Sequence, residues 1–161
     1  MRTALEKSSQ PTYWKRARGK SHRRIRRDPL LISCPDRSRL LRLLGSRRAS
    51  EFDAQRVDDL LFEVERATPV AADAIPPDVV TMNAWFRFTD LTSHVVRECA
   101  IVFPAEANDS GGRISVLEPL GIALLGNRVG DVVNLDDAGG EKRLRIDVIT
   151  YQPEAAGDYE L

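Results

Sequence analysis

The sequence predicts an α+β protein, in which a short helical hairpin precedes an antiparallel sheet with one short helix. Two patterns of apolar residues lead to this prediction. Between residues 40 and 64 they recur at steps of three and four, as on one face of a helix, and from residue 82 they alternate, as in a half-buried strand. Prolines at 69, 76 and 77 separate the two patterns. The expected units are an amino-terminal basic extension (1–28), the hairpin (29–68), a linker (69–77) and a carboxy-terminal domain (78–161).

The hairpin is expected to consist of two antiparallel helices. The first should start near Asp36, because Pro35 and Asp36 are both common at helix beginnings, and should stop at Gly45. The second should begin at Ser50, whose hydroxyl can cap the amide of Asp53. The apolar stripes of the two helices are Leu40, Leu41, Leu43 and Leu44 in the first, and Phe52, Val57, Leu60, Leu61 and Val64 in the second.

The carboxy-terminal domain is expected to hold about five strands. Met82, Ala84, Phe86 and Phe88 alternate with more polar residues and mark the buried face of the first. A helix should run from Pro119 to Gly126, since proline favours a helix start and glycine a helix end. The other strands are predicted at 96–104, 113–117, 129–135 and 142–151, with hairpin turns at the glycine pairs 111–112 and 139–140.

The formal net charge of zero hides an uneven distribution. Residues 1–28 contain ten lysines and arginines and two acids, whereas the remainder contains fourteen basic and twenty-two acidic residues. A basic arm of net charge +8 therefore precedes an acidic body of net charge −8. The arm lacks apolar periodicity, so we expect it to be disordered.

The chain contains few residues that could serve in catalysis or bind a metal ion. Cys34 and Cys99 lie far apart in the sequence and form no close pair of the kind that zinc sites use, so we expect two reduced, partly buried thiols. The only histidines are His22, in the basic arm, and His94, in a predicted turn. Neither is placed to activate a nucleophile. No stretch reads as a secretory signal or a membrane span, so a cytoplasmic protein without enzymatic activity or cofactor is expected.

Four strings in the carboxy-terminal domain carry a family resemblance: DVVTMN (78–83), ISVLEPLGIALLG (114–126), VGD (129–131) and YQPEAAGDY (151–159). In this order they resemble Rnk-type proteins, known as regulators of nucleoside diphosphate kinase and related to the GreA and GreB transcription elongation factors. The helical hairpin fits the same resemblance. The resemblance implies an FKBP-like carboxy-terminal domain, a coiled-coil-like hairpin, and docking of a monomer on core RNA polymerase at the rim of its secondary channel.

The resemblance also suggests which residues would contact the polymerase. Glu118, Pro119, Leu120 and Gly121 stand where Gre factors make this contact. Leu120 could be an exposed anchor or part of the core face of its helix, and both interpretations stay open. Trp85 is a further candidate because it is out of phase with the buried positions of its strand, although it could instead cover the apolar stripe of the hairpin.

Transcript cleavage is not expected, although the Gre resemblance would suggest it. Gre factors help to hold a metal ion with acidic residues at the tip of a long hairpin. The predicted tip here, Gly45–Ser50, carries Arg47 and Arg48 and no acid, so it would repel the cation, and no metal site is expected. We therefore expect a protein that competes with Gre factors and modulates elongation. The alternative is direct regulation of nucleoside diphosphate kinase.

Two charged segments keep more than one interpretation at this stage. The acidic tail from Glu154 to Glu160 could pack on the body or remain solvated. The basic arm could contact DNA or RNA phosphates nonspecifically, could be an organellar transit peptide, or could be an extension without function that results from a start site assigned too far upstream. Its candidate nucleic-acid contacts are Lys15, Arg16, Arg18, Lys20, Arg23, Arg24, Arg26 and Arg27.

Overall fold

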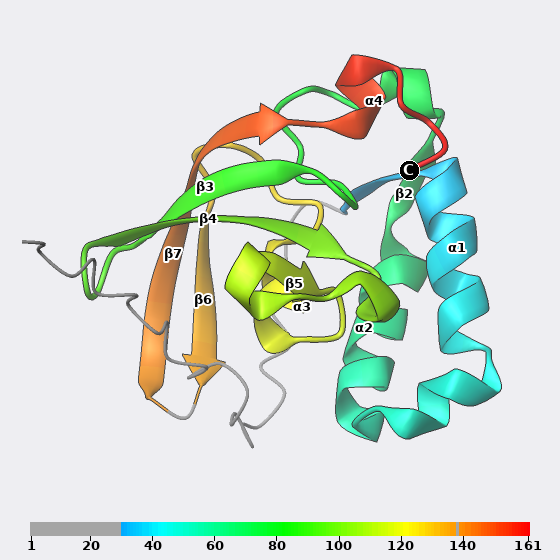
Figure 1. Ribbon diagram of the computed structural model, residues 1–161, viewed down its shortest axis with the longest axis horizontal. Helices are drawn as coiled ribbons and strands as arrows, with labels where there is room; N and C mark the ends of the chain where they lie inside the picture. The colour runs from blue at the N-terminus through cyan, green and yellow to red at the C-terminus, as the bar shows by residue number, and fades with distance from the viewer. Residues whose placement is uncertain (1–29, 138) are drawn as a thin grey trace, which may run out of the picture.

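The computed structural model describes residues 30–137 and 139–161. In this part of the chain, helices precede a curled five-stranded sheet, which confirms the predicted α+β class (Figure 1). The basic residues of the arm and their predicted contacts with nucleic acid lie outside the described residues. Among the described helices, none is both long enough and apolar enough to cross a membrane.

Two antiparallel helices form the predicted hairpin, α1 (Cys34–Leu44) and α2 (Ala54–Arg66), and a 3-10 helix over Arg47–Glu51 joins them (Figure 1). The hydroxyl of Ser33 caps α1 by accepting the Asp36 N–H at 3.3 Å. Asp36 therefore lies in the first turn of α1, as its pairing with Pro35 predicted.

The predicted start of the second helix at Ser50 is wrong. The Ser50 hydroxyl donates to the Arg47 carbonyl inside the 3-10 helix, so it is not available as a cap. Asp53 takes that role, because its carboxylate accepts the N–H groups of Gln55 at 3.0 Å and Arg56 at 3.2 Å. A cap three residues later leaves Arg47–Glu51 to form a separate turn at the tip of the hairpin.

A small parallel sheet brackets the hairpin and was not expected from the sequence. Strand β1 (Leu31–Ser33) leads directly into α1, and β2 (Thr68–Val70) follows α2. The two strands pair in parallel, with Leu31 opposite Thr68. Part of the predicted linker is thus a strand, and a 3-10 helix over Ala72–Ala74 follows it. Strands of three residues are too short to show a periodic pattern in the sequence.

The main sheet has the strand order β5-β4-β3-β7-β6. Its four antiparallel strands fit the prediction, but β5 pairs with β4 in parallel, so the sheet is mixed. The glycines at 111 and 112 lie in a tight turn closed by the bridge between Asn108 and Arg113, and that turn does not join antiparallel strands. The strands are β3 (Trp85–Asp90), β4 (Val95–Val102), β5 (Arg113–Ser115), β6 (Val132–Asp137) and β7 (Gly140–Tyr151).

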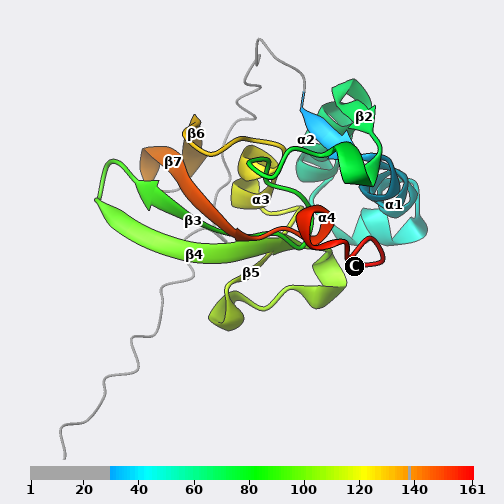
Figure 2. The same ribbon diagram turned by 90° about the horizontal axis from the view of Figure 1, so that it is seen from above.

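One hydrophobic core joins the sheet to the hairpin. Phe86 and Phe88 point inward from β3, as the alternation predicted, and both are buried. Helix α3 (Pro119–Leu124) lies against one side of the curled sheet and the hairpin stands beside it (Figure 2). Leu40 of α1 and Leu60 of α2 belong to the same buried cluster as the phenylalanines, so the hairpin and the sheet pack as one body.

The start of the acidic tail packs on the body, whereas the side chains of residues 155–161 are exposed. Gln152 precedes the short helix α4 (Pro153–Ala156), and its amide nitrogen donates to the carbonyls of Pro76 at 2.9 Å and Val79 at 2.8 Å. Glu154 is buried and accepts the Thr81 hydroxyl at 2.7 Å. The tail thereby fixes the segment that leads from β2 to β3.

The tail also reaches α1. The guanidinium of Arg39 donates to the carbonyls of Tyr159, at 3.3 Å, and Leu161. Next to this contact, the buried carboxyl of Asp36 lies in a small cleft that Glu154 also lines. Burial raises the pKa of Asp36 to about 7, and the negative charge of Glu154 adds to the effect.

The raised pKa predicts that stability falls as pH rises. Since the folded state holds the Asp36 proton more tightly than the unfolded chain, this contribution is complete below the ordinary pKa of 3.8 and is lost as pH rises towards 7. The free energy of unfolding should fall by up to about 1.4 kcal/mol per pH unit in that window. Asp36→Asn, which cannot ionise, should flatten the dependence and be more stable than the natural chain above pH 7. Urea denaturation at a series of pH values tests this, and parallel curves for the two proteins would contradict it.

Candidate functional site: the Glu118 corner

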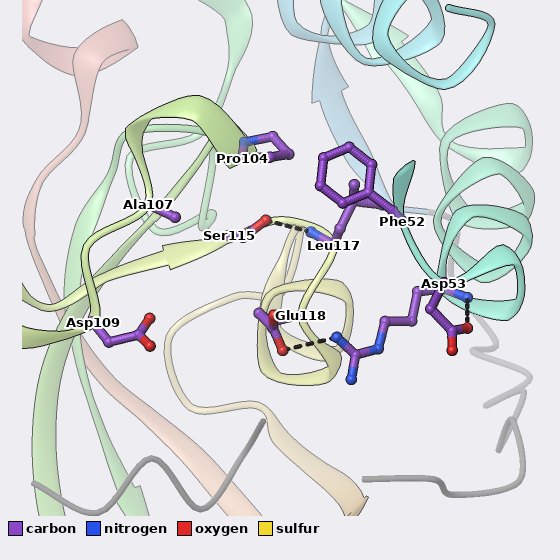
Figure 3. Close-up of a pocket in the computed structure, with 9 residues that line it drawn as sticks. Phe52, Asp53, Pro104, Ala107, Asp109, Ser115, Leu117 and Glu118 are labelled. Atoms are coloured by element: carbon purple, nitrogen blue, oxygen red, sulfur yellow. Dashed lines mark hydrogen bonds and ion pairs between the residues drawn. The ribbon is translucent and has the colours of Figure 1, made fainter. Parts of the chain in front are cut away.

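A pocket of about 250 Å³ opens where the start of α2 meets the corner between β5 and α3 (Figure 3). Phe52 approaches it from the hairpin side, and Leu117 and Glu118 belong to the corner. The predicted polymerase contact at Glu118 therefore lies at the edge of a hollow between hairpin and sheet. The remaining lining residues are Asp53, Arg56, Pro104, Ala107, Asp109 and Ser115.

The corner itself is a tight turn built around Ser115. The backbone N–H of Glu118 donates to the Ser115 carbonyl at 2.9 Å, and the N–H of Leu117 donates to the Ser115 hydroxyl at 3.2 Å. Pro119 then occupies the first turn of α3, where its missing N–H costs no helical hydrogen bond. These bonds hold the backbone of Glu118 and Pro119 in one conformation.

Gly121 allows α3 to approach the end of β5. A Cβ atom at this position would lie 3.0 Å from the Val116 Cα and still closer to the Ser115 carbonyl oxygen. Both neighbours are backbone atoms, which cannot move aside as a flexible side chain would. Only glycine fits here, so Gly121 has a packing role and its buried position offers a partner no side chain.

An ion pair links the corner to the hairpin. The Arg56 guanidinium lies 3.1 Å from the Glu118 carboxylate, and the two side chains are 23% and 20% exposed. Among the residues that line the pocket, Asp53, Asp109 and Glu118 carry carboxylates and Arg56 is the one basic residue.

Leu120 is part of the core. Its side chain is only 6% exposed and packs within the main hydrophobic cluster, so the anchor interpretation is wrong for this residue. A glutamate at this position would bury an unpaired charge and unfold the domain rather than report on binding. Of the four predicted corner residues, Glu118 and Pro119 are the two that remain partly accessible.

Trp85 lies away from the corner pocket, at the start of β3. It is half-buried, as a residue on the face opposite Phe86 should be. Its ring lies beside Gly112, 3.4 Å from the position of a built Cβ atom there. Trp85 therefore covers the turn before β5 and not the apolar stripe of the hairpin, which was the alternative weighed from the sequence.

The comparisons with known proteins agree with this architecture. A model of the family described as "Transcription elongation factor, GreA/GreB, C-term" matches residues 75–151. The regulator of nucleoside diphosphate kinase from Escherichia coli (strain K12) is 39% identical over 128 residues, which cover 70% of this chain and 94% of that protein. The chain belongs to the GreA/GreB transcription elongation factor family.

Two further members of the GreA/GreB family show the same relation. GreA from Thermotoga neapolitana is 30% identical over 105 residues, which cover 63% of this chain and 67% of that protein. The solved structure of a GreA/GreB elongation factor from Nitrosomonas europaea is 38% identical, covers 77% of this chain and 99% of its own, and superposes with a TM-score of 0.64. Both the order of elements and the fold are thus those of the family.

Of the nine residues that line the pocket at the Glu118 corner, sequence reasoning named only Glu118 as a site residue. Phe52 was assigned to the apolar stripe of the hairpin, and Arg56 and Asp109 carried no motif at all. Arg56 reaches Glu118 across 62 positions of sequence, and that pairing depends on how the hairpin leans on the sheet. A single sequence holds no signal for such a contact.

The cysteines and the described histidine, which were considered for catalysis or metal binding, lie away from the pocket at the Glu118 corner. Burial raises the pKa of the Cys99 thiol to about 12, whereas Cys34 is exposed on α1. His94 occupies the turn between β3 and β4 with a φ of 60°. Within residues 30–137 and 139–161, no three histidine, cysteine or acidic side chains are grouped so that they could hold a metal ion.

The contact at Gly121 predicts a strong effect of a single methyl group. Gly121→Ala should lower the free energy of unfolding by about 3 kcal/mol, because the new Cβ overlaps backbone atoms on the neighbouring turn. Gly111→Ala is the matched control, since its Cβ would meet only the exposed side chain of Asn108, at 3.3 Å, which needs to give way by a few tenths of an ångström. Chemical denaturation of both variants measures the difference. Equal stability of the two variants would show that α3 can shift away from Ser115.

Proposed function

We propose that this protein binds core RNA polymerase through the Glu118 corner, at the rim of the secondary channel, and modulates elongation by competing with Gre factors. The observation that carries the proposal is the GreA/GreB carboxy-terminal domain itself, matched over residues 75–151 with the corner at an accessible edge. A partner would meet the carboxylate of Glu118 and the ring of Pro119. The turn around Ser115 fixes the backbone of both residues, so that ordering this backbone on binding costs little conformational entropy.

The proposed role does not include transcript cleavage. Helices α1 and α2 contain 11 and 13 residues, so at about 1.5 Å per residue each spans only about 16–20 Å. The tip between them presents Arg47 and Arg48, whose positive charges oppose a bound Mg²⁺. We infer that the hairpin occupies space near the polymerase without delivering a metal ion.

A second candidate function is direct control of a nucleotide-metabolising kinase. The name of the Escherichia coli relative, regulator of nucleoside diphosphate kinase, favours it. The two candidates differ in the partner that the protein should retain. An affinity-tagged chain should co-purify with core polymerase under the first proposal and with the kinase under the second. Retention of the kinase by purified protein in the absence of polymerase would overturn the first.

Glu118→Gln should weaken binding to core polymerase about tenfold, because a hydrogen bond to a charged group contributes about 1.5 kcal/mol or more. The variant also loses the ion pair with Arg56, and Arg56→Gln is therefore its matched control, since it removes the same pair from the hairpin side. Titration of labelled protein with core polymerase measures both affinities. If the two variants bind equally weakly, the ion pair and not the corner carboxylate matters, and if both bind normally, polymerase does not contact Glu118.

The proposal further predicts that the protein leaves stalled transcripts intact. Purified chain added with Mg²⁺ to stalled elongation complexes should give no shortened RNA above the level without protein, because Arg47 and Arg48 oppose a bound cation and Glu51 is the one carboxylate in the turn that they begin. When a Gre factor is added as well, increasing amounts of this protein should suppress the cleavage that the Gre factor causes. Cleavage by this protein alone, or no suppression at saturating amounts, would contradict the proposed role.

A further inference from the structure

A small cleft lies where residues 153–161 meet the start of α1. These residues include α4 and the acidic tail, and we call them the tail segment. Figure 1 shows the tail segment ending beside the first turn of α1. Two carboxyl groups line the cleft, that of Asp36 from α1 and that of Glu154 from α4, and these residues are only 4% and 9% exposed.

The cleft has little room to hydrate these carboxyl groups. It encloses about 10 Å³, which holds a single water molecule at most. A buried carboxylate therefore needs hydrogen bonds or a counter-charge from the protein to offset its lost hydration. Glu154 has such a partner, because the Thr81 hydroxyl donates to its carboxylate at 2.7 Å. A second negative charge, on Asp36, would lie in the same closed space and repel the first.

One guanidinium group serves both sides of the cleft. The Nη1 atom of Arg39 lies 3.8 Å from Oδ1 of Asp36, which is longer than a hydrogen bond. The same side chain donates to the backbone carbonyls of Tyr159, at 3.3 Å, and Leu161. While the tail segment is in place, Arg39 is thus divided between the tail carbonyls and Asp36, and the carboxyl of Asp36 lacks a hydrogen-bonded counter-charge.

Asp36 is the group of this cleft that holds a proton near neutral pH. Burial, and then the negative charge of Glu154, raise the pKa of Asp36 to about 7 against the smaller opposing effect of the nearby guanidinium. The other ionisable residues that line the cleft are Asp158 and Tyr159, and its described lining includes no histidine or lysine. The carboxylate of Asp158 accepts the hydroxyl of Tyr151.

The tail segment can leave the cleft without opening the hydrophobic core. The buried cluster that joins hairpin and sheet, together with the hydrophobic residues packed against it, includes no described residue beyond Ile149. The side chains from residue 155 onward are exposed, and the N–H of Asp158 bonds within the segment, to the Pro153 carbonyl at 2.8 Å. A segment with so few contacts to the body opens locally at a small cost in free energy.

We propose that the tail segment is a proton-controlled latch, which closes over α1 when the carboxyl of Asp36 is protonated and opens when that proton is lost to solvent. Ionised Asp36 attracts the guanidinium of Arg39, which then turns from the tail carbonyls to the carboxylate. Opening also separates Asp36 from Glu154 and admits water to both carboxylates. The group that holds the latch closed thereby becomes the group that releases it. This proposal does not depend on the polymerase contact at Glu118.

The sign of the effect follows from the bound proton. Because the closed form holds the Asp36 proton more tightly than the open form, closure is fully favoured below the ordinary pKa of 3.8 and loses this support as pH rises towards 7. The ratio of closed to open forms should fall by up to about tenfold per pH unit in this window, since opening releases one proton. Above the window the ratio should level off.

Methyl NMR spectra of the full chain between pH 4.5 and 8.5 test the latch, because methyl protons do not exchange with water. The methyl groups of Leu161 and Met82 report on it, since both residues line the cleft. As pH rises, the Leu161 signals should move towards those of a free peptide of residues 152–161, while signals from the core, such as those of Leu124, stay in place. Signals of Leu161 that keep their low-pH positions up to pH 8.5 would overturn the proposal.

Two variants separate the latch from other titrations. Asp36→Asn keeps the size of the side chain and cannot ionise, so its Leu161 signals should stay at the closed positions throughout. Glu106→Gln is the matched control, because it removes an exposed carboxylate that does not line the cleft, and it should titrate like the natural chain. If Asp36→Asn still titrates, another group drives the opening, and if it is already open at pH 4.5, the carboxyl is only a structural contact. Either result would contradict the latch.

Discussion

The structure depends on one shared hydrophobic core, because neither the hairpin nor the sheet can bury its apolar face alone. Leu60 and Val64 of α2 are almost completely buried, although a hairpin of two short helices has no interior of its own. They belong to one buried cluster with residues of α1, α3 and β3, among them Leu40, Leu124 and Phe86. The position of the hairpin relative to the sheet is therefore set by packing and not by a flexible connection.

Polar contacts at both ends of the hairpin preserve this arrangement. At one end the Arg56–Glu118 ion pair spans the pocket, and at the other Arg39 and the buried Asp36 meet the acidic tail. A partly exposed ion pair contributes little stability by itself. The ion pair instead orients the two elements, since it aligns the start of α2 with the Glu118 corner. The carboxylate of this corner is the group that we propose a partner contacts. The pocket exists because the core brings these two elements close but does not fill the space between them.

The helices and strands with a strong apolar periodicity were predictable from the sequence, whereas the tertiary contacts between them were not. The alternation at Met82, Ala84, Phe86 and Phe88 identified the buried face of β3, because a strand with one face on the core must alternate. Leu120 showed the limit of such reasoning: its sequence suited both a core helix and an exposed anchor, and only the approach of α3 to Ser115 decides between them. The parallel pairing of β4 with β5 and the cap at Asp53 likewise depend on tertiary contacts.

The short parallel pair of β1 and β2 has a consequence for how this architecture can vary. Because Leu31 lies opposite Thr68, the chain enters and leaves the hairpin at adjacent points. Whole helical turns can then be added to or removed from both helices at the far end of the hairpin without moving the junction at β1 and β2. In a family built this way, the length of the hairpin and the residues at its tip can diverge while the carboxy-terminal domain stays the same. The hairpin is in this sense an exchangeable module, and its length is a variable independent of the fold that carries it.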